Sequence, residues 1–338
     1  MSEELENLNL TFKSWDNFNP IRIEATEPLE SKSSFFLVEF DSQEQASYGL
    51  VGSLSIKNIL GGQIHCHEAI FPEKLERIQR EFSKELVQKN PIVLIANLDC
   101  ILNFSPPVTE LKCIKSAKTK SKQTLRLFEL LAEDIPDLSM IPLCLADGHH
   151  RYHAFKNLIL SHKDWERASL ASVVFPASGV LTSRKRVVFL EDSFSLAPFF
   201  HFLQRNSLVE EIHRDSKCEG IKLRFQGRWF EIPIRLVFKK FSQRERFQDC
   251  LLFPHQFLLR LLKESKVKIK TPFSLVPEED LFQLEKDMEL NRFEGFILPA
   301  DNPESVMKIA FEGKILEANS TFFKPKFDNN FITHRMIR

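Results

Sequence analysis

Apolar and polar positions along the chain form short blocks whose spacing changes from place to place. Residues 34–40 (SFFLVEF) and 47–56 (SYGLVGSLSI) have the composition of strands, and the polar segment between them predicts a hairpin. Residues 62–70 (GQIHCHEAI) predict a further strand after a Gly-Gly turn. The run at 91–98 (PIVLIANL) is short and continuously apolar, which is typical of a strand buried on both faces.

Helices are predicted where apolar residues recur at spacings of three and four. The clearest case lies between Leu75 and Leu86, which together with a proline in the first turn predicts a helix over 72–88. We also expect residues 124–133 (TLRLFELLAE) to be helical. The lysine-rich run before them, 112–122 (KCIKSAKTKSK), predicts a solvated loop.

The second half of the chain continues the same mixture of strands and helices. Residues 221–238 predict a hairpin, 277–290 a helix and 293–299 a strand. Residues 302–313 (NPESVMKIAFEG) predict a helix with Asn, Pro and Gly in their preferred positions at its ends. The predicted fold class is therefore α+β, a mixed α/β fold.

No sharp linker divides the chain of 338 residues. Residues 1–33 are polar and weakly patterned, and we expect them to form an N-terminal arm. Residues 34–338 are predicted to form a single domain. This domain is either one compact unit or two packed subdomains, 34–180 and 190–338, that meet within 178–192.

The charge balance bears on the partners of the protein. The chain has 46 basic and 46 acidic residues, whereas proteins that bind nucleic acid usually have a basic excess or a concentrated basic face. The N-terminus lacks the pattern of a secretory signal, and no apolar stretch approaches the roughly eighteen residues of a membrane span. We therefore expect neither a nucleic-acid nor a membrane partner, and the sequence leaves the oligomeric state open.

The cysteines bear on the cellular compartment. None of the six lies in a Cys-x-x-Cys pair, which argues against zinc-ribbon and thioredoxin chemistry. Cys144 lies in an apolar, strand-like run, so buried and reduced thiols are expected. Reduced thiols fit a reducing compartment, and we expect a soluble, cytoplasmic protein. The Gly-x-Ser-x-Gly elbow and the Gly-x-x-x-x-Gly-Lys-Ser/Thr loop are both absent from the sequence.

The strongest local signal is the sequence ADGHHRY, in which an apolar strand ends and a helix begins. Asp147 closes the strand, and Gly148 permits a turn that other residues resist. The amides of the first helical turn attract anions, and His149, His150 and Arg151 add donors at the same place. Asp147 could hold a metal ion or orient one of the histidines. The plainer alternative is that Asp147 only caps the helix and that the histidines are surface residues.

A second candidate site lies in the predicted strand 62–70. On a strand, His65 and His67 would face one side, and Cys66 and Glu68 the other. Two histidines at this spacing can bind a metal, although no third ligand is evident. Glu68, at the end of the strand, is a candidate general base or magnesium ligand.

Three weaker candidates are basic or hydroxyl-bearing residues elsewhere. Arg186, in a run of three basic residues, could reach a phosphate, and the alternative is a solvated strand start. Arg77 lies off the apolar stripe of its helix, where the alternative is a salt bridge. Near the C-terminus a short run either offers hydroxyls and an ammonium group or forms a plain edge strand. Its candidates are Ser320, Thr321 and Lys326.

Taken together, these motifs resemble the bacterial family catalogued as domain of unknown function 1015 (DUF1015). The sequence ADGHHRY matches the central signature of that family without change. Residues 308–326 resemble its closing block, which contains Lys-Ser-Thr-x-Phe-x-Pro-Lys. The resemblance extends over about residues 35 to 335. Its other blocks lie at 63–77 (QIHCHEAIFPEKLER), 90–93 (NPIV), 186–188 (RVV) and 227–230 (GRWF).

The Asp-Gly-His-His-Arg turn is also similar to that of ParB-like proteins, including the free serine kinases. This resemblance implies a ParB/sulfiredoxin-like core with a packed C-terminal α/β extension. It also implies a small-molecule kinase that uses Mg²⁺ with ATP or ADP. Asp147 to Arg151 would form the phosphate and metal turn, and Glu68 would be the base with His67 beside it. The other nucleotide-binding candidates would be Arg77, Arg186, Ser320, Thr321 and Lys326.

Some family features are missing from this sequence. Residues 1–34 have no equivalent of the family's Pro-Pro-Tyr-Asp segment, and Ala318-Asn319 replaces a usual Pro-Lys. The first hypothesis is a kinase acting on a small hydroxyl compound, with free L-serine as the leading acceptor. The second is a non-catalytic nucleotide- or phosphate-binding module, and the third is a ParB-like nucleic-acid partner, which the neutral charge disfavours. Proximity of Glu68 to the Asp147 turn would favour the first.

Overall fold

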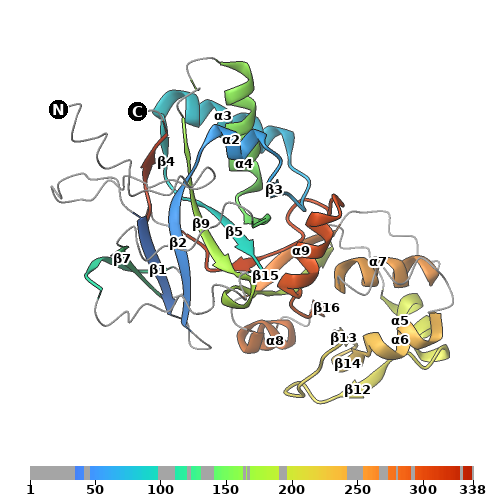
Figure 1. Cartoon of the computed structure of the whole chain (residues 1–338). Coiled ribbons are helices and arrows are strands. Elements are labelled where there is room, and N and C mark those ends of the chain that lie inside the picture. Colours follow the sequence, from blue (N-terminus) through green and yellow to red (C-terminus); the bar gives the residue numbers. More distant parts are fainter. Residues whose placement is uncertain are drawn as a thin grey trace, which may run out of the picture. The chain divides into compact units, whose positions relative to one another are not determined.

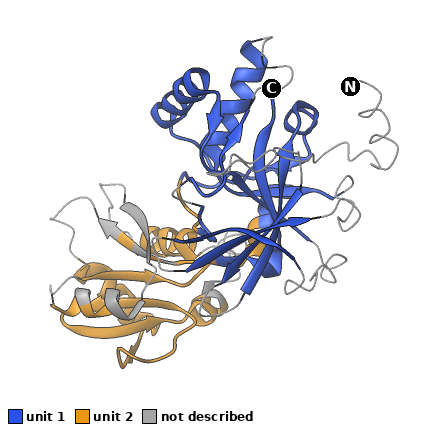
Figure 2. Ribbon diagram, turned by 90° about the vertical axis from the view of Figure 1, so that its left-hand side faces the viewer, with its two compact units in different colours: residues 1–181, 307–318, 323–338 blue, residues 182–306, 319–322 orange. Residues whose placement is uncertain are grey.

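The computed structural model describes residues 35–41, 46–97, 111–119, 123–130, 141–162, 165, 168–189, 196–241, 254–265, 273–278, 281–290, 294–327 and 330–336. The chain forms two compact units (Figure 2). Unit 1 comprises residues 1–181, 307–318 and 323–338, and unit 2 comprises residues 182–306 and 319–322. The predicted N-terminal arm lies outside the described residues. Within the described part of the chain, no helix is both long and apolar enough to cross a bilayer.

Unit 1 is built on a mixed sheet of eight strands (Figure 1). These are β1 (Phe35–Asp41), β2 (Ala46–Leu54), β3 (Ile64–His65), β5 (Ile92–Ala96), β6 (Cys113–Lys118), β7 (Thr124–Leu130), β8 (Leu143–Asp147) and β9 (Leu170–Pro176). Their order in the sheet is β3-β8-β5-β9-β2-β1-β7-β6, with parallel pairing at β3–β8 and at β5–β9. Strands β5, β8 and β9 are almost entirely buried, and for β5 the continuous apolar run at 91–98 predicted this.

The described helices of unit 1 include α2 (Ile56–Leu60), α3 (Pro72–Glu85) and α4 (His149–Ser161). Helices α3 and α4 pack against each other (Figure 1). Ile78 and Phe82 of α3 belong to the same core cluster as Phe155 and Leu158 of α4. The apolar stripe found in the sequence is therefore the buried face of α3, and it fixes this helix beside α4.

The chain leaves α3 earlier than the sequence predicts. Leu86 has a left-handed backbone conformation (φ 54°), and its amide donates to the carbonyl of Phe82. The next residues form β4 (Val87–Gln88), which pairs with β18 (His334–Arg335) near the C-terminus. The last residues of the chain therefore belong to unit 1, although most of the preceding hundred residues belong to unit 2.

Two local predictions are wrong, and both concern residues that join the sheet edge. Residues 124–130 form β7 instead of a helix, because they pair along their whole length with β1. Their side chains alternate in burial at first, with Leu125 and Leu127 inside, so tertiary pairing overrides the helix propensity of leucine. Residues 113–118 of the lysine-rich run form the edge strand β6 instead of a loop. Lysines on an edge strand discourage pairing with other chains.

Unit 2 has a six-stranded sheet in which every pair is antiparallel. In order across the sheet the strands are β12 (Glu210–Ile212), β14 (Arg228–Ile232), β13 (Ile221–Phe225), β16 (Gly295–Leu298), β11 (Arg184–Phe189) and β15 (Phe273–Glu278). The described helices that begin in this unit are α5 (Ala197–Arg205), α6 (Ile234–Phe241), α7 (Pro254–Glu264), α8 (Leu281–Leu290) and α9 (Pro303–Phe311). Helix α9 ends in unit 1.

The core of unit 2 is rich in phenylalanine. Phe199, Phe257 and Phe296 are fully buried, and the rings of Phe199 and Phe296 meet edge to face at 5.7 Å. The predicted hairpin over 221–238 is confirmed for β13 and β14, while its last residues begin α6. The helix predicted from residue 277 begins only at α8, because residues 277–278 pair with β11. Both units mix helices with sheet, so the predicted mixed α/β class is confirmed.

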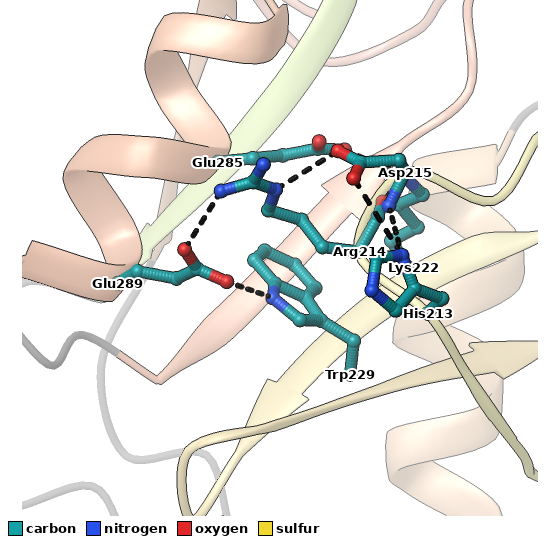
Figure 3. A network of polar contacts seen from close by, with 7 residues as sticks. All are labelled: His213, Arg214, Asp215, Lys222, Trp229, Glu285 and Glu289. Atoms are coloured by element: carbon teal, nitrogen blue, oxygen red, sulfur yellow. Dashed lines mark hydrogen bonds and ion pairs between the residues drawn. The ribbon is translucent and has the colours of Figure 1, made fainter.

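A buried ion pair lies within a polar network of unit 2 (Figure 3). Lys222 Nζ lies 2.5 Å from Glu285 Oε1, and both side chains are almost fully buried. Lys222 also donates to the backbone carbonyl of Arg214 at 2.8 Å. Glu289 accepts hydrogen bonds from Arg214 Nη1 and Trp229 Nε1, each at 3.0 Å. The network links α8 to strands β13 and β14.

Replacing Lys222 with methionine is expected to destabilise unit 2 by about 3–5 kcal/mol, because Glu285 would stay buried without its countercharge. Urea unfolding of the full chain measures the loss. The matched control is Arg228→Met, which breaks an ion pair between side chains that are 63% and 49% exposed and should cost far less. Equal losses in the two variants would contradict the stabilising role of the Lys222 pair.

Candidate functional site

The turn between β8 and α4 is specified by a single glycine. Gly148 has φ +96°, a conformation that favours glycine. A Cβ atom at this position would lie 2.8 Å from Ile92 Cγ2 and about 3 Å from the guanidinium group of Arg151. Both the backbone conformation and the available space therefore require glycine where the strand passes into the helix.

The first turn of α4 faces the end of β8 with its amide groups. The amide of Tyr152 donates to the carbonyl of Gly148 at 2.9 Å, which starts the helical hydrogen-bond pattern. The preceding amides have no carbonyl partner within the helix, and they lie at its positive end. The Tyr152 hydroxyl donates to the carbonyl of Ile59 at 3.1 Å and anchors this turn to α2. The sequence pattern and the geometry agree on an anion-attracting helix start.

Asp147 is oriented by an arginine. Its Oδ2 atom lies 2.8 Å from Arg151 Nη2, one helical turn further on. The Asp147 side chain is 32% exposed and that of Arg151 is 22% exposed, so both groups remain accessible. In the described structure the Nε atom of Arg151 is buried without a hydrogen-bond partner. The described contact of the Asp147 carboxylate is thus with Arg151.

His149 connects the turn to Glu68. Its Nδ1 atom lies 3.7 Å from Glu68 Oε2, and its Nε2 atom accepts a long hydrogen bond of 3.5 Å from the amide of His67. The rings of His149 and His67 meet edge to face at 4.6 Å. Burial, followed by the neighbouring histidines, holds the pKa of His149 well below its usual range. A neutral ring that accepts at Nε2 carries its proton on Nδ1, directed at Glu68.

His150 is also a buried acceptor. Its Nε2 atom accepts a hydrogen bond of 2.9 Å from the amide of Phe71, the residue before α3. Burial, followed by the charge of Lys74, lowers the pKa of His150 to about 4. The sequence predicted that His149 and His150 would donate to a ligand. In the structure the Nε2 atom of each ring accepts a backbone N–H group, so each neutral ring keeps one donor, its Nδ1–H group.

The segment that carries His67 and Glu68 leaves the sheet after β3. The carbonyl of His67 accepts from the amide of Leu316 at 2.6 Å, and the amide of Ala69 donates to the carbonyl of Leu316 at 2.9 Å. The predicted alternation of side chains is wrong here, because strand pairing ends at residue 65. Both His67 and Glu68 contact His149, while the ring of His65 lies against Phe311 at 5.0 Å.

The structure thus brings His67 and Glu68 to the turn at 147–151. Arg77 lies 3.7 Å from Glu81, with both side chains mostly exposed, which is the salt-bridge alternative. Lys326 is exposed and lies in unit 1, two residues after β17 (Phe323–Lys324). Three candidates belong to unit 2: Arg186 on β11, and the buried Ser320 and Thr321.

Several residues beside the turn were not among the site candidates found in the sequence. Cys144 Sγ lies 3.9 Å from His67 Nδ1, and the ring of Phe323 meets that of His67 at 6.0 Å. Burial raises the pKa of the Cys144 thiol, which is therefore protonated and inert. Phe71 stacks on His150, with ring centroids 5.9 Å apart. Their positions depend on contacts between distant segments, which spacing in the sequence does not report.

The donors of the site suit only certain metals. Within the residues that the structure describes, no group of three or more His, Cys, Asp or Glu side chains is placed to hold an ion. Mg²⁺ does not need such a group, because it is usually bound by one or two carboxylates together with substrate phosphates. The partly exposed carboxylate of Asp147, beside an anion-attracting helix start, fits an ion of that kind.

Acidification is expected to destabilise unit 1. The pKa values of His149, His150 and His153 are all lowered in the folded chain, chiefly by burial. Below the unfolded value of about 6.5 the unfolded chain binds more protons, so stability is lost as the pH falls. The midpoint of thermal unfolding, measured from about pH 7.5 to pH 5, should therefore drop. His149→Gln should reduce that pH dependence, and an equal drop in this variant would contradict the role of His149.

Comparisons with solved structures find chains of low identity that are similar to this one over most of its length. A free serine kinase in complex with AMP is 12% identical, with coverage of 88% of this chain and 91% of that chain and a TM-score of 0.37. A conserved hypothetical protein from Pyrococcus furiosus is 15% identical, with coverage of 78% and 88% and a TM-score of 0.35. C-terminally truncated SbnI from Staphylococcus aureus is 11% identical, with coverage of 84% and 87% and a TM-score of 0.41.

Sequence comparison gives two further results. None of the curated proteins compared with the chain matches it. The profile of the family described as "Protein of unknown function (DUF1015)" matches residues 25–239.

Proposed function

The chain belongs to the DUF1015 family of proteins of unknown function, and from that premise and the geometry of the site we propose that it is a nucleotide-dependent kinase. Its substrate is a small metabolite with a hydroxyl group, of which free L-serine is the leading choice. The motif resemblance to free serine kinases points in the same direction. The alternative is a non-catalytic module that binds a nucleotide or phosphate at the same turn.

The observation that carries the proposal is the meeting of Glu68 with the first turn of α4, at 3.7 Å from His149 Nδ1. A carboxylate placed beside an anion-attracting turn weakens the binding of phosphate, so it is a poor choice for a module that only binds. It is useful where a hydroxyl must lose its proton next to a phosphoryl group. The position of Glu68 therefore favours the kinase over the binding module.

The phosphates of the nucleotide are assigned to the helix start and to Arg151. The first-turn amides supply N–H donors, and the helix dipole favours negative charge there. Arg151 offers a guanidinium fork that can pair with phosphate oxygens, and its contact with Asp147 keeps it at the turn. Gly148 leaves room for the Arg151 guanidinium at the turn, because a side chain there would press on it and on Ile92.

Proton transfer is assigned to Glu68. The carboxylate accepts the proton of the substrate hydroxyl as the hydroxyl oxygen bonds to the terminal phosphorus. The bond from that phosphorus to its bridging oxygen breaks, and the shorter nucleotide leaves as AMP from ADP or as ADP from ATP. His149 acts as a positioning residue, because its Nδ1 atom lies 3.7 Å from Glu68 Oε2.

Magnesium is assigned to the same place. Asp147 would hold the ion together with the phosphates of the nucleotide. When bound, Mg²⁺ neutralises charge that develops on the phosphoryl oxygens. The protein's own contribution is to hold the Asp147 carboxylate in one orientation through Arg151.

Isothermal calorimetry with the full chain, Mg²⁺ and ADP or ATP, followed by product analysis with L-serine and a panel of other small alcohols, tests the proposal. We expect nucleotide binding, consumption of nucleotide that depends on the acceptor, and weaker binding in Asp147→Asn. Binding without turnover of any acceptor would favour the non-catalytic module. A chain that binds neither nucleotide would exclude both the kinase and a nucleotide-binding module.

A further inference from the structure

Phe71 presents an aromatic ring at the edge of the site. It is the residue before α3, and its side chain is 46% exposed. Its amide donates to His150 Nε2 at 2.9 Å, and its ring stacks on the His150 ring with an interplanar angle of 15°. The backbone and the ring are thus both held against the second residue of α4, while a large part of the ring stays open to solvent.

Exposed aromatic rings are rare in the part of the chain that the structure describes. Among the residues whose exposure is described, Phe71 (46%) and Phe311 (36%) are the most exposed of the large aromatic residues. Phe311 lies edge-on to His65, which does not belong to the turn. Phe71 touches the turn itself, through His150. A half-exposed phenylalanine lacks part of the favourable free energy that comes from burying apolar surface. A ligand that covers the ring would supply it.

Two cations and one carboxylate act on the charge state of His150. The cations are Lys74, in the first turn of α3, and Arg151, in the first turn of α4, and the carboxylate is that of Asp147, which is paired with Arg151 at 2.8 Å. The amides of the same helical turn add N–H donors. An open ring face, two cations and a helix start therefore lie around one histidine. A ligand that matches all of them has an aromatic part joined to an anionic part.

We infer that the ring of Phe71 is the stacking platform for the base of a nucleotide whose phosphates bind at the Asp147–Arg151 turn. This inference rests on the proposed function and deepens it, because it assigns the base to α3 and the phosphates to α4. Each nucleobase has an aromatic face, and stacking on a protein ring contributes substantially to binding. Phe71 thereby distinguishes a nucleotide from inorganic phosphates, which have no base.

Calorimetry of the full chain in Mg²⁺ with ADP and, separately, with inorganic pyrophosphate tests this platform. In Phe71→Ala the affinity for ADP should fall by about 5- to 100-fold, the range of losses measured when a stacking aromatic is removed. The affinity for pyrophosphate should stay within about 2-fold of the wild-type value. Phe71→Trp keeps a flat ring and should keep ADP affinity. Phe311→Ala is the matched control and should change neither affinity.

Each result decides a different point. Equal weakening of ADP and pyrophosphate in Phe71→Ala would show that Phe71 only supports the turn, and it would overturn the inference. Unchanged ADP affinity in that variant, or a loss confined to Phe311→Ala, would overturn it as well while leaving nucleotide binding intact. A wild-type chain that binds neither ADP nor pyrophosphate would instead contradict the proposed function.

Discussion

The Glu68→Gln variant is expected to transfer phosphate about 10²- to 10⁴-fold more slowly than the wild-type chain. Glutamine keeps the shape of the side chain but cannot accept the proton of the substrate hydroxyl. Because the carboxylate repels phosphate, its loss should leave nucleotide affinity unchanged or slightly raised. A turnover assay with L-serine, combined with calorimetry of nucleotide binding, measures the two effects separately.

The control for this variant is Glu76→Gln, which changes an exposed glutamate on α3 within the same unit. It should retain wild-type turnover and binding. If Glu68→Gln turned over normally, Glu68 would not be the base, and the argument for a kinase over a binding module would lose its main support. If it lost nucleotide binding as well as turnover, Glu68 would be a structural residue of the turn.

The Gly148→Ala variant is expected to have a lower free energy of unfolding than the wild-type chain, for two reasons. The left-handed conformation costs a residue with a side chain about 1–2 kcal/mol, and the new methyl group would press on Ile92 and on the Arg151 guanidinium. Overpacking of this kind adds about 1–3 kcal/mol. Displacing Arg151 should also weaken nucleotide binding by at least about 10-fold, since a hydrogen bond to a charged group contributes about 1.5–3 kcal/mol.

The Gly62→Ala variant separates the effect of backbone conformation on stability from the effect of overpacking. Gly62 also has a positive φ, +76°, but a Cβ atom there would meet nothing within 4 Å. This variant should therefore lose only the conformational part of the stability and should bind nucleotide normally. Urea unfolding and calorimetry on both variants give the comparison. Equal binding by Gly148→Ala and Gly62→Ala would contradict the role of the turn as a phosphate site.

The elements predicted best are those whose apolar pattern in the sequence matches the face that is buried in the fold. The run at 91–98 is continuously apolar and contains the buried strand β5, and the stripe on α3 is the core face of that helix. The failures lie where pairing between distant segments decides the structure. Thr124 to Leu130 are rich in leucine, and the sequence does not reveal that β1 supplies hydrogen bonds to them. The same is true of the lysines in β6, which pair with β7.

The candidate site shows the same division. The strand, the glycine and the helix start could be predicted because they are neighbours in sequence. The distance between Glu68 and His149 could not, because it depends on how Leu316, near the other end of the chain, holds the segment after His67. The acceptor role of the two histidines also depends on their burial. This burial could not be predicted, because the sequence ADGHHRY is largely polar.

The most direct test of the proposed function is a search for O-phosphoserine by mass spectrometry. The full wild-type chain is incubated with Mg²⁺, free L-serine and either ADP or ATP. We expect phosphoserine to form in equal amount to the AMP or ADP released, and to be absent without enzyme or without nucleotide. Nucleotide that is bound but never consumed, with L-serine or with any other small alcohol, would contradict a kinase.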